Sequence, residues 1–170
     1  MTDSPQVLLM MGSDSDLPVM QEAAAVLRKF GIPFEMHVAS AHRSPTKAMT
    51  LASEAAGRGI RAIIAGAGMA AHLAGVVAAK TTLPVIGVPM PGGALNGVDA
   101  LYSTVQMPGG IPVATMAIGK AGAKNAGLFV VQIMALHDER LAGALTAYRR
   151  EMEDEVETKD ATLQAAGREA

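Results

Sequence analysis

A histidine and an arginine stand side by side in the polar stretch Ser40-Ala41-His42-Arg43-Ser44-Pro45, directly after an apolar run. An imidazole can take up and release a proton near neutral pH, and a guanidinium can hold a phosphate through two hydrogen bonds. Ser44 and Pro45 suffice to begin a helix, as N-cap and first helical residue, which leaves His42 and Arg43 without a local structural task. The pair is therefore a candidate for proton transfer and phosphate binding. The alternative is a solvent-exposed pair without function.

Hydroxyl and carboxylate groups crowd a second stretch, Gly12-Ser13-Asp14-Ser15-Asp16, which also follows an apolar run. Its backbone N–H groups and hydroxyls can hold a phosphate, and a carboxylate can hold a ribose. Serine and aspartate are also preferred N-caps, so the same residues can begin a helix, and both roles can coexist. The stretch lacks the lysine and the spacing of a P-loop, which disfavours nucleoside triphosphates as ligands.

Glycine and alanine dominate a third stretch, Gly66-Ala67-Gly68-Met69-Ala70-Ala71-His72. The spacing of Gly66, Gly68 and Ala71 matches a dinucleotide-binding fingerprint. That fingerprint also requires an acidic residue about 20 positions further on, where this chain has Gly87-Val88-Pro89-Met90. A nicotinamide or flavin dinucleotide is therefore disfavoured. A loop that lets its backbone approach a small planar or carboxylated ligand remains, with His72 at its end.

Other reactive groups have weaker support in the sequence. His37 lies within a predicted strand and His137 at a predicted helix end, where structural roles are commoner, and nothing distinguishes Lys80, Lys120 or Lys124 as reactive amines. The chain has no cysteine, and its histidines form no metal-binding pattern. We therefore expect no metal site and no thiolate chemistry.

Alternating strands and helices must position the three stretches. The hydrophobic pattern predicts strands over 7–11, 34–39, 60–65, 85–88 and 113–118, helices over 17–30, 45–57, 70–80 and 121–135, and a helix or turn around 96–105. Such alternation with short glycine-bearing turns predicts a three-layer, doubly wound α/β fold with a parallel sheet, flavodoxin-like in strand order. Ligands of such sheets bind beyond the carboxyl ends of the strands, where all three stretches fall.

The domain organisation follows from a change in composition near residue 138. Residues 7–137 are predicted to form one α/β catalytic domain, preceded by a disordered segment, 1–6. Residues 138–170 are rich in Glu, Lys, Arg and Ala, and Leu141, Leu145, Tyr148 and Met152 mark one apolar stripe. We expect a peripheral C-terminal helix with a frayed tail that packs on a neighbouring subunit.

Charge and hydropathy limit the partners and the compartment. The 14 Lys and Arg against 16 Asp and Glu give a net charge of -2, which argues against nucleic-acid binding. The polar start and the short apolar run 7–11 fit neither a signal peptide nor a membrane span, so a soluble, cytoplasmic protein is expected. Hydrophobic residues make up 50% of the chain and charged residues only 18%, below the usual quarter or so. Apolar surface that one small domain cannot hide favours a homo-oligomer.

Five motifs, in order, resemble one family, the bacterial 5-(carboxyamino)imidazole ribonucleotide mutases, also known as the AIR carboxylase catalytic subunit. They are MGSDSD (11–16), SAHRSP (40–45), IIAGAGMAAHLAG (63–75), LPVIGVP (83–89) and VQMPGGIPVATMAIGKAGAKNAGL (105–128). The resemblance extends over roughly residues 7–150. It implies an isomerase of purine biosynthesis, an octamer, and no metal or organic cofactor.

The resemblance also implies roles for individual residues. His42 would be the general acid–base of a carboxyl shift on a ribonucleotide. Ser13, Ser15, Asp16, Ser40 and Arg43 would hold the ribose and phosphate, and Gly68, Met69, Ala70, His72 and Leu73 would line the pocket for the ring and its carboxyl group. A dry glycine-rich pocket would retain the carbon dioxide between its release and its recapture.

Three positions depart from the family pattern. Met69 stands where relatives usually have glycine, Ala74 where many have proline, and residues 91–93 lie where the family varies. A positive φ at Met69 would strain the methionine, so we expect either that the loop differs from that of relatives or that the angle is ordinary.

Three alternatives to the mutase stay open from sequence. A related carboxylase would take free carbon dioxide directly onto aminoimidazole ribonucleotide with the same histidine. A non-catalytic nucleotide-binding module would bind the ligand without turnover. A dinucleotide-dependent oxidoreductase is disfavoured by the missing acidic residue.

Overall fold

A computed structural model describes residues 4–167 of the chain. The chain divides into two compact units, Met1–Val130 and Val131–Ala170. The first unit contains the sheet and the loops that carry the candidate residues. The second contains the end of one helix and a long C-terminal helix.

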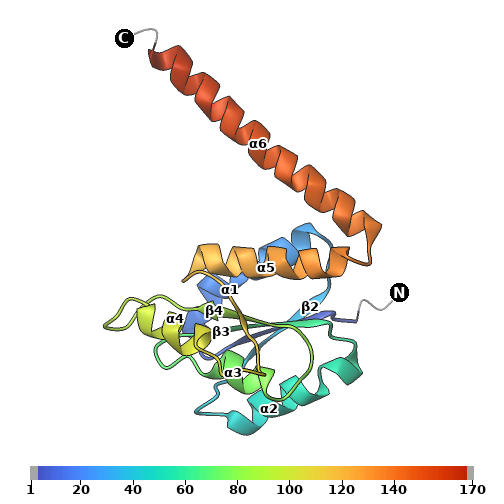
Figure 1. Ribbon diagram of the computed structural model, residues 1–170, viewed down its shortest axis with the longest axis vertical. Helices are drawn as coiled ribbons and strands as arrows, with labels where there is room; N and C mark the ends of the chain where they lie inside the picture. Colours follow the sequence, from blue (N-terminus) through green and yellow to red (C-terminus); the bar gives the residue numbers. More distant parts are fainter. Residues whose placement is uncertain (1–3, 168–170) are drawn as a thin grey trace. The chain divides into compact units, whose positions relative to one another are not determined.

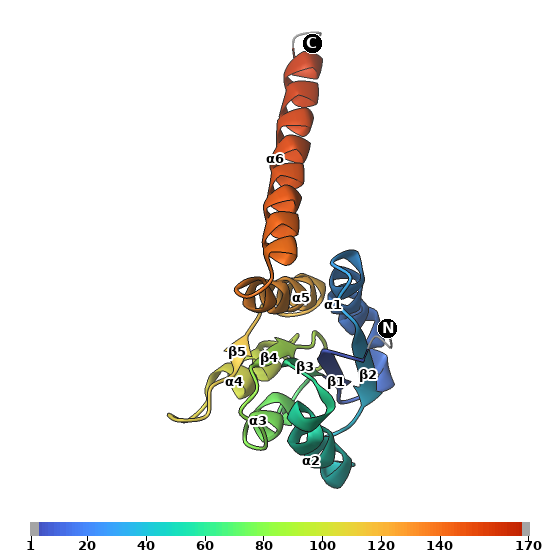
Figure 2. The same cartoon turned by 90° about the vertical axis from the view of Figure 1, so that its right-hand side faces the viewer.

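Five parallel strands form the sheet of the first unit, in the order β2-β1-β3-β4-β5 (Figure 2). The strands are β1 (Val7–Met11), β2 (Phe34–Val38), β3 (Ala62–Ala67), β4 (Val85–Pro89) and β5 (Ala114–Thr115). The central strands β1, β3 and β4 are the apolar runs and are almost wholly buried, as expected of parallel strands covered on both faces. The predicted flavodoxin-like fold is confirmed.

Helices cover both faces of this sheet. One face carries α1 (Leu17–Lys29) and the part of α5 (Lys120–Ala135) that belongs to the first unit; the other carries α2 (Pro45–Glu54), α3 (Leu73–Ala78) and α4 (Val98–Val105) (Figures 1 and 2). Short 3-10 turns, η1 (Asp14–Asp16) and η2 (Ala56–Arg58), precede α1 and follow α2. The result is the predicted three-layer arrangement.

Small residues let the helices pack closely on the sheet. A Cβ at Gly87 would lie 2.4 Å from Thr104 Cγ2 of α4, and one at Gly127 of α5 would lie 2.9 Å from Val26 Cβ of α1. At Gly66, near the end of β3, an added Cβ would meet Met90 Cε at 2.3 Å and Met20 Sδ at 2.6 Å. The glycine- and alanine-rich composition therefore reflects tight contact between layers, with methionines filling the remaining space.

The largest difference from the predicted elements lies after β3. The third helix begins at Leu73, whereas the pattern predicted a start at Ala70. The N–H of Ala71 donates to Met69 O and the N–H of His72 donates to Ala70 O, both at 2.9 Å, so these residues form tight turns in place of helix. Residues 68–72 are thereby free to line a pocket.

The second unit contains α6 (Glu139–Gly167), a helix of 29 residues. Asp138 Oδ1 accepts the Leu141 N–H at its start. The frayed tail predicted from sequence is helical as far as Gly167, because no glycine or proline interrupts the residues between Gly143 and Gly167. Leu141 is buried, whereas every residue from Arg149 to Gly167 is exposed.

The predicted disorder of residues 1–6 falls partly outside the described residues, which begin at Ser4. Gln6 extends the strand pairing, since its N–H donates to Pro33 O and its carbonyl accepts the Arg61 N–H, each at 2.8 Å. Between residues 4 and 167, no helix combines the length and apolarity needed to cross a membrane.

Candidate active site

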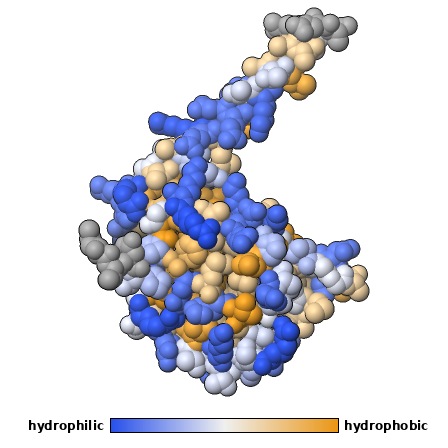
Figure 3. Space-filling view, turned by 180° about the vertical axis from the view of Figure 1, so that it is seen from behind, coloured by the Kyte–Doolittle hydropathy of each residue, from blue (hydrophilic) through white to orange (hydrophobic). Residues whose placement is uncertain are grey.

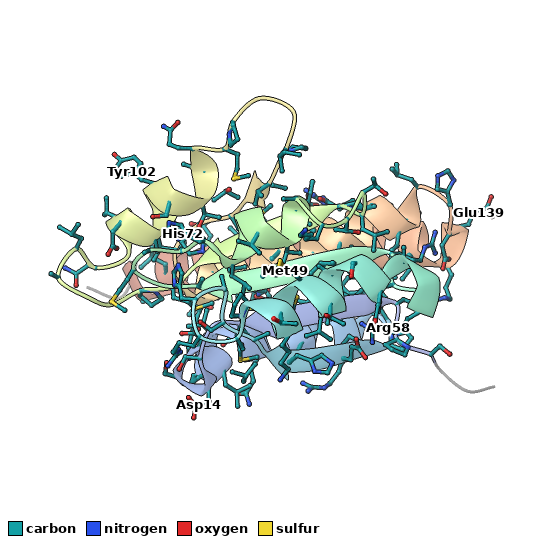
Figure 4. All side chains as sticks on the ribbon, turned by 90° about the horizontal axis from the view of Figure 1, so that it is seen from below. Asp14, Met49, Arg58, His72, Tyr102 and Glu139 are labelled. Atoms are coloured by element: carbon teal, nitrogen blue, oxygen red, sulfur yellow. The ribbon has the colours of Figure 1, made fainter. Side chains whose placement is uncertain are left out.

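The three candidate stretches meet at the carboxyl ends of β1, β2 and β3, around a pocket of about 550 Å³. Asp14 and His72 lie toward one end of the sheet, and Arg58 lies toward the other (Figure 4). All eleven residues predicted to act or bind line the pocket: Ser13, Ser15, Asp16, Ser40, His42, Arg43, Gly68, Met69, Ala70, His72 and Leu73. The fold thus brings together residues up to 60 positions apart, and their individual roles toward a substrate stay predictions.

The loop after β1 is held by a capping box. Ser13 Oγ accepts the Ser15 N–H at 3.3 Å, and Asp16 Oδ2 accepts the Ser13 N–H at 3.1 Å. Local helix capping, one of the two roles predicted for these residues, is therefore present. The same hydroxyl and carboxylate also line the pocket, so the second role is compatible with the first.

Asp16 carries a carboxyl group in a partly desolvated place. Burial raises the pKa of Asp16 above its ordinary value of 3.8, while hydrogen bonds from Ser13, Ser15 and Gly12 and the charge of Arg43 act in the opposite direction. Because this carboxyl group and the Arg43 guanidinium line the same pocket, a ligand there meets both an acceptor and a cation.

Side-chain hydroxyls also fix the loop after β2. Ser40 Oγ accepts the N–H groups of His42 and Arg43 at 3.3 and 3.1 Å. Ser44 Oγ accepts the Ser40 N–H at 2.9 Å and donates to Ser40 O at 3.2 Å. Ser44 is the residue before helix α2, as predicted, but its side chain caps no helix N–H. It is instead a brace for the loop that carries His42.

Arg43 ties the first two loops together. Its Nη2 donates to Gly12 O at 2.9 Å. A guanidinium has five N–H donors, so this bond leaves donors for an anionic ligand. Arg43 is exposed at the pocket, where a phosphate can reach it.

His42 and His72 contact each other directly. His42 Nε2 lies 2.8 Å from His72 Nδ1, and the two rings meet edge to face with centroids 4.9 Å apart. A hydrogen bond of this kind has one donor nitrogen and one acceptor nitrogen, so the two facing nitrogens share one proton. Protonating both would oppose two cations and remove the bond. This hydrogen bond fixes the orientation of the His42 ring and links it to the His72 ring.

Met69 occupies the left-handed region of backbone conformation, with a φ of +52°. Methionine in this region costs roughly 1–2 kcal/mol relative to ordinary angles. The expectation of an ordinary angle at Met69 is therefore wrong, and the methionine is strained. Its side chain is 65% exposed at the rim of the pocket.

Comparison with known proteins identifies the family of the chain that forms this pocket. A model of the AIR carboxylase family matches residues 6–155, which include every pocket residue. The chain belongs to the AIR carboxylase family. The resemblance of the five motifs is thereby confirmed.

Relatives and solved structures agree with this membership. The chain is 56% identical over 164 residues to the N5-carboxyaminoimidazole ribonucleotide mutase of Synechocystis, covering 96% of this chain and 92% of the relative. It is 52% identical to the phosphoribosylaminoimidazole carboxylase of Candida albicans over 98% of this chain, which spans 29% of that longer protein. The crystal structure of Treponema denticola PurE matches with a TM-score of 0.84 at 29% identity, covering 94% of this chain and 98% of that one.

In this AIR carboxylase family member, several features of the pocket were not predicted from sequence. Backbone and small side chains of Gly12, Ala41 and Ala67 complete the lining. The contact between His42 and His72 was also missed, because β1 lies between β2 and β3 and the two loops are not neighbours in the sheet. Position after a strand end was the only sequence signal for either finding.

The other polar residues considered from sequence lie elsewhere. His37 Nε2 lies 3.6 Å from Glu35 Oε1, which lies 2.6 Å from Arg58 Nη1, so His37 belongs to an ionic cluster on β2 outside the pocket. Lys120 lies 3.8 Å from Glu22. In the part of the chain that the structure describes, no three His, Asp or Glu side chains gather as a metal site would require.

Proposed function

We propose that this chain interconverts 5-carboxyaminoimidazole ribonucleotide and 4-carboxy-5-aminoimidazole ribonucleotide in purine biosynthesis, as an isomerase of the mutase type. One observation carries the proposal: the histidine suited to proton transfer stands in a pocket with the serines, carboxylate and arginine suited to a ribose phosphate. The Synechocystis relative is named as a mutase, and this chain is 56% identical to it over 92% of the length of that relative.

The polar loops account for binding of the ribose phosphate. Arg43 supplies a positive charge, and the hydroxyls of Ser13, Ser15 and Ser40 supply hydrogen bonds. The Asp16 carboxylate is suited to accept hydrogen bonds from the ribose hydroxyls. Hydrogen bonds to the backbone already hold these side chains before a ligand binds. Binding therefore costs little side-chain entropy.

The reaction requires one proton to be delivered to the substrate and one proton to be removed from it. The N–C bond of the carbamate breaks, carbon dioxide departs, and the exocyclic nitrogen takes up a proton. Ring carbon 4 then attacks the carbon dioxide, the new C–C bond forms, and that carbon loses its proton. Atoms and electrons balance without an oxidant or reductant. His42, as general acid and then general base, can serve both steps because one imidazole reaches both neighbouring positions.

His72 orients that imidazole. Its Nδ1, 2.8 Å from His42 Nε2, holds that ring in place, and the neighbouring residues of the same loop are suited to receive the base ring and its carboxyl group. The Gly68, Ala70 and Leu73 lining leaves room for carbon dioxide and offers it no nucleophile.

A carboxyl-shift assay tests this function. Purified protein is given each ribonucleotide in turn, and the other is measured by absorbance. Replacing His42 by Asn is expected to lower kcat by about 10²–10⁴-fold, the usual contribution of a general acid–base, while the ribonucleotide still binds. His137→Asn, at the end of α5 and outside the pocket, is the control. Full turnover by His42→Asn would overturn the proposed mechanism.

The same assay separates the alternatives. A direct carboxylase would consume free bicarbonate or carbon dioxide with aminoimidazole ribonucleotide, and the Candida albicans relative of that name supports testing it. A non-catalytic binding module would show binding with no turnover of any of these ribonucleotides.

We further propose that the chain assembles as a homo-octamer in the cytoplasm, with α6 packed on a neighbouring subunit. Apolar side chains are exposed on and beside α4, at Leu95, Val98, Tyr102, Val105 and Ile111, and along α6, at Met152, Val156 and Leu163. Figure 3 shows hydrophobic residues among hydrophilic ones on the surface of the first unit, and a largely hydrophilic α6. Light scattering by the full chain should give eight times 17.4 kDa. Val156→Asp is expected to lower that mass.

A further inference from the structure

Residues 66–68 lead from β3 into the wall of the pocket, and backbone hydrogen bonds hold them on both sides. Gly66 O accepts the Gly12 N–H at 3.1 Å, and Ala67 O accepts the Met90 N–H at 2.9 Å. Bonds between neighbouring strands lie close to the plane of the sheet, so they fix these residues sideways. How far the residues stand out of that plane depends on what packs against them.

Met90 packs behind this segment. A Cβ at Gly66 would overlap Met90 Cε and would lie 2.6 Å from Met20 Sδ of α1. A Cβ at Gly68 would lie 3.3 Å from Met90 Cβ, so one methionine side chain follows both glycines. Because side chains alternate across a strand, Ala67, which lines the pocket, points to the opposite face.

The contacts of Met90 are internal to the chain. Met90 is 3% exposed, Met20 is fully buried, and neither lines the pocket. The backbone of Met90 is confined as well, since its N–H is bonded and a Cβ at Gly97 would lie 2.8 Å from its carbonyl oxygen. From this fixed backbone, the thioether side chain can determine where residues 66–68 lie.

The position of residues 66–68 affects His72. From Gly68 the chain runs through the two tight turns of residues 69–72, each closed by a bond of 2.9 Å. The second turn ends at His72, whose Nδ1 lies 2.8 Å from His42 Nε2. A separation of about 3.6 Å is no longer a hydrogen bond, so moving His72 away by about 0.8 Å would break this contact.

We propose that Met90 is a positioning residue for the carboxyl shift: its side chain sets how far residues 66–68 stand out of the sheet, and thereby keeps His72 in contact with His42. A shorter side chain would leave a void, into which the surrounding structure collapses only in part. Gly66 and Gly68 would move into it, because they have no side chains that obstruct the movement. This inference rests on the proposed carboxyl shift.

Met90→Ala tests the proposal through the separate responses of kcat and KM. We expect kcat to fall about tenfold, as for the loss of one hydrogen bond to His42. KM should change less than about twofold, because the loops after β1 and β2 keep their side chains. Met90→Leu keeps a similar volume and should restore kcat to within about threefold of wild type.

Met134→Ala is the matched control for a cavity in the core. Met134, in α5, is also 3% exposed and lies outside the pocket. Both alanine variants should lower the melting temperature by a similar amount, but only Met90→Ala should lose kcat. Wild-type kcat in Met90→Ala, or an equal loss of kcat in Met134→Ala, would overturn the proposal.

A double-mutant cycle tests whether Met90 acts through His72. Met90→Ala should lower kcat in the wild type but hardly further in His72→Phe, where the bond to His42 is already absent. Met90→Val removes less volume and carries the same cycle if Met90→Ala does not fold. Equal falls in kcat in both backgrounds would overturn the proposal.

A crystal structure of the Met90→Ala variant tests the positioning without turnover. The distance between His42 Nε2 and His72 Nδ1 should exceed about 3.5 Å, beyond hydrogen-bond range. An unchanged distance of 2.8 Å would overturn the proposal. If the distance increases but the wild type performs no carboxyl shift, the proposed function fails while the positioning of His72 by Met90 stands.

Discussion

The two sides of the pocket are built in different ways. On the side of β1 and β2, the side-chain oxygens of Ser13, Asp16, Ser40 and Ser44 accept hydrogen bonds from backbone N–H groups, which fixes both loops. On the side of β3 and β4, glycines, a left-handed Met69 and exposed tight turns form the wall. The braced side is suited to the ribose phosphate, whose shape is the same in both ribonucleotides. In the proposed reaction, the other side, with fewer side-chain bonds to its backbone and called the softer side below, would face the group that changes position.

The strongest test of the braced side is Arg43→Met. It removes the bond to Gly12 O together with the cation proposed for the phosphate. Hydrogen bonds involving a charged group contribute about 1.5–3 kcal/mol, so KM should rise roughly 10- to 100-fold with a smaller change in kcat. Steady-state kinetics beside Lys47→Met, an exposed residue of α2, would measure it. An unchanged KM would remove Arg43 from the binding site.

On the softer side, His72→Phe keeps an aromatic ring and removes the bond to His42 Nε2. We expect kcat to fall about tenfold, the equivalent of one lost hydrogen bond of about 1.4 kcal/mol, while KM changes little. His137→Phe is the control. A loss confined to KM would mean that His72 contacts the substrate and does not orient His42, and the two sides would then differ less than proposed.

Ser44→Ala tests how much the Ser44 side chain contributes to the free energy of unfolding. The substitution leaves the Ser40 N–H without its partner in a partly buried loop, whereas the Ser40 carbonyl keeps its bond from the Ser44 backbone N–H at 3.0 Å. Thermal or urea unfolding should show a loss of about 1–3 kcal/mol, against less than about 0.5 kcal/mol for Ser53→Ala on the exposed face of α2. Equal stabilities of the two variants would contradict a brace.

The smallest effect is expected from Asp16→Asn and depends on pH. Because burial raises the pKa of Asp16 above 3.8, the folded protein binds more protons than the unfolded chain just above that pH. Wild-type stability contributed by this group is complete below 3.8 and is lost as the pH rises through the folded-state value. Asn cannot titrate, so the melting temperature of Asp16→Asn relative to wild type should increase over this window. A difference that stays constant with pH would contradict the burial.

The sequence predicted the sheet well because its strands are short apolar runs next to glycine. It also located the pocket, since the loops after parallel strands meet at one edge and His42 and Arg43 had no local structural task. Boundaries failed where local geometry overrode periodicity, as at residues 70–72, whose alanines resemble a helix start. The backbone of Met69 determines that turn, and no spacing rule predicts a methionine with positive φ.

Contacts between loops were also beyond the sequence. The Ser44 side chain suits a helix cap by residue type, yet it is used to brace Ser40, because the loop places that carbonyl and N–H nearer than the helix N–H groups. The bond between His42 and His72 depends on two loop conformations at once. Contacts between two loops can be read only from the three-dimensional structure, whereas the strands and their order could be predicted from the hydrophobic pattern.

The packing around Gly66 affects which substitutions this chain can accept. The Cβ space of Gly66 is filled by the side-chain ends of Met20 and Met90, so the end of β3, directly before the pocket residues Ala67 and Gly68, packs on flexible thioether chains and not on neighbouring backbone. In a library of random variants, Gly66→Ala should therefore be accepted when Met20 or Met90 shifts or is replaced by a shorter side chain. The strand end before the pocket can then be altered with every pocket-lining residue left unchanged.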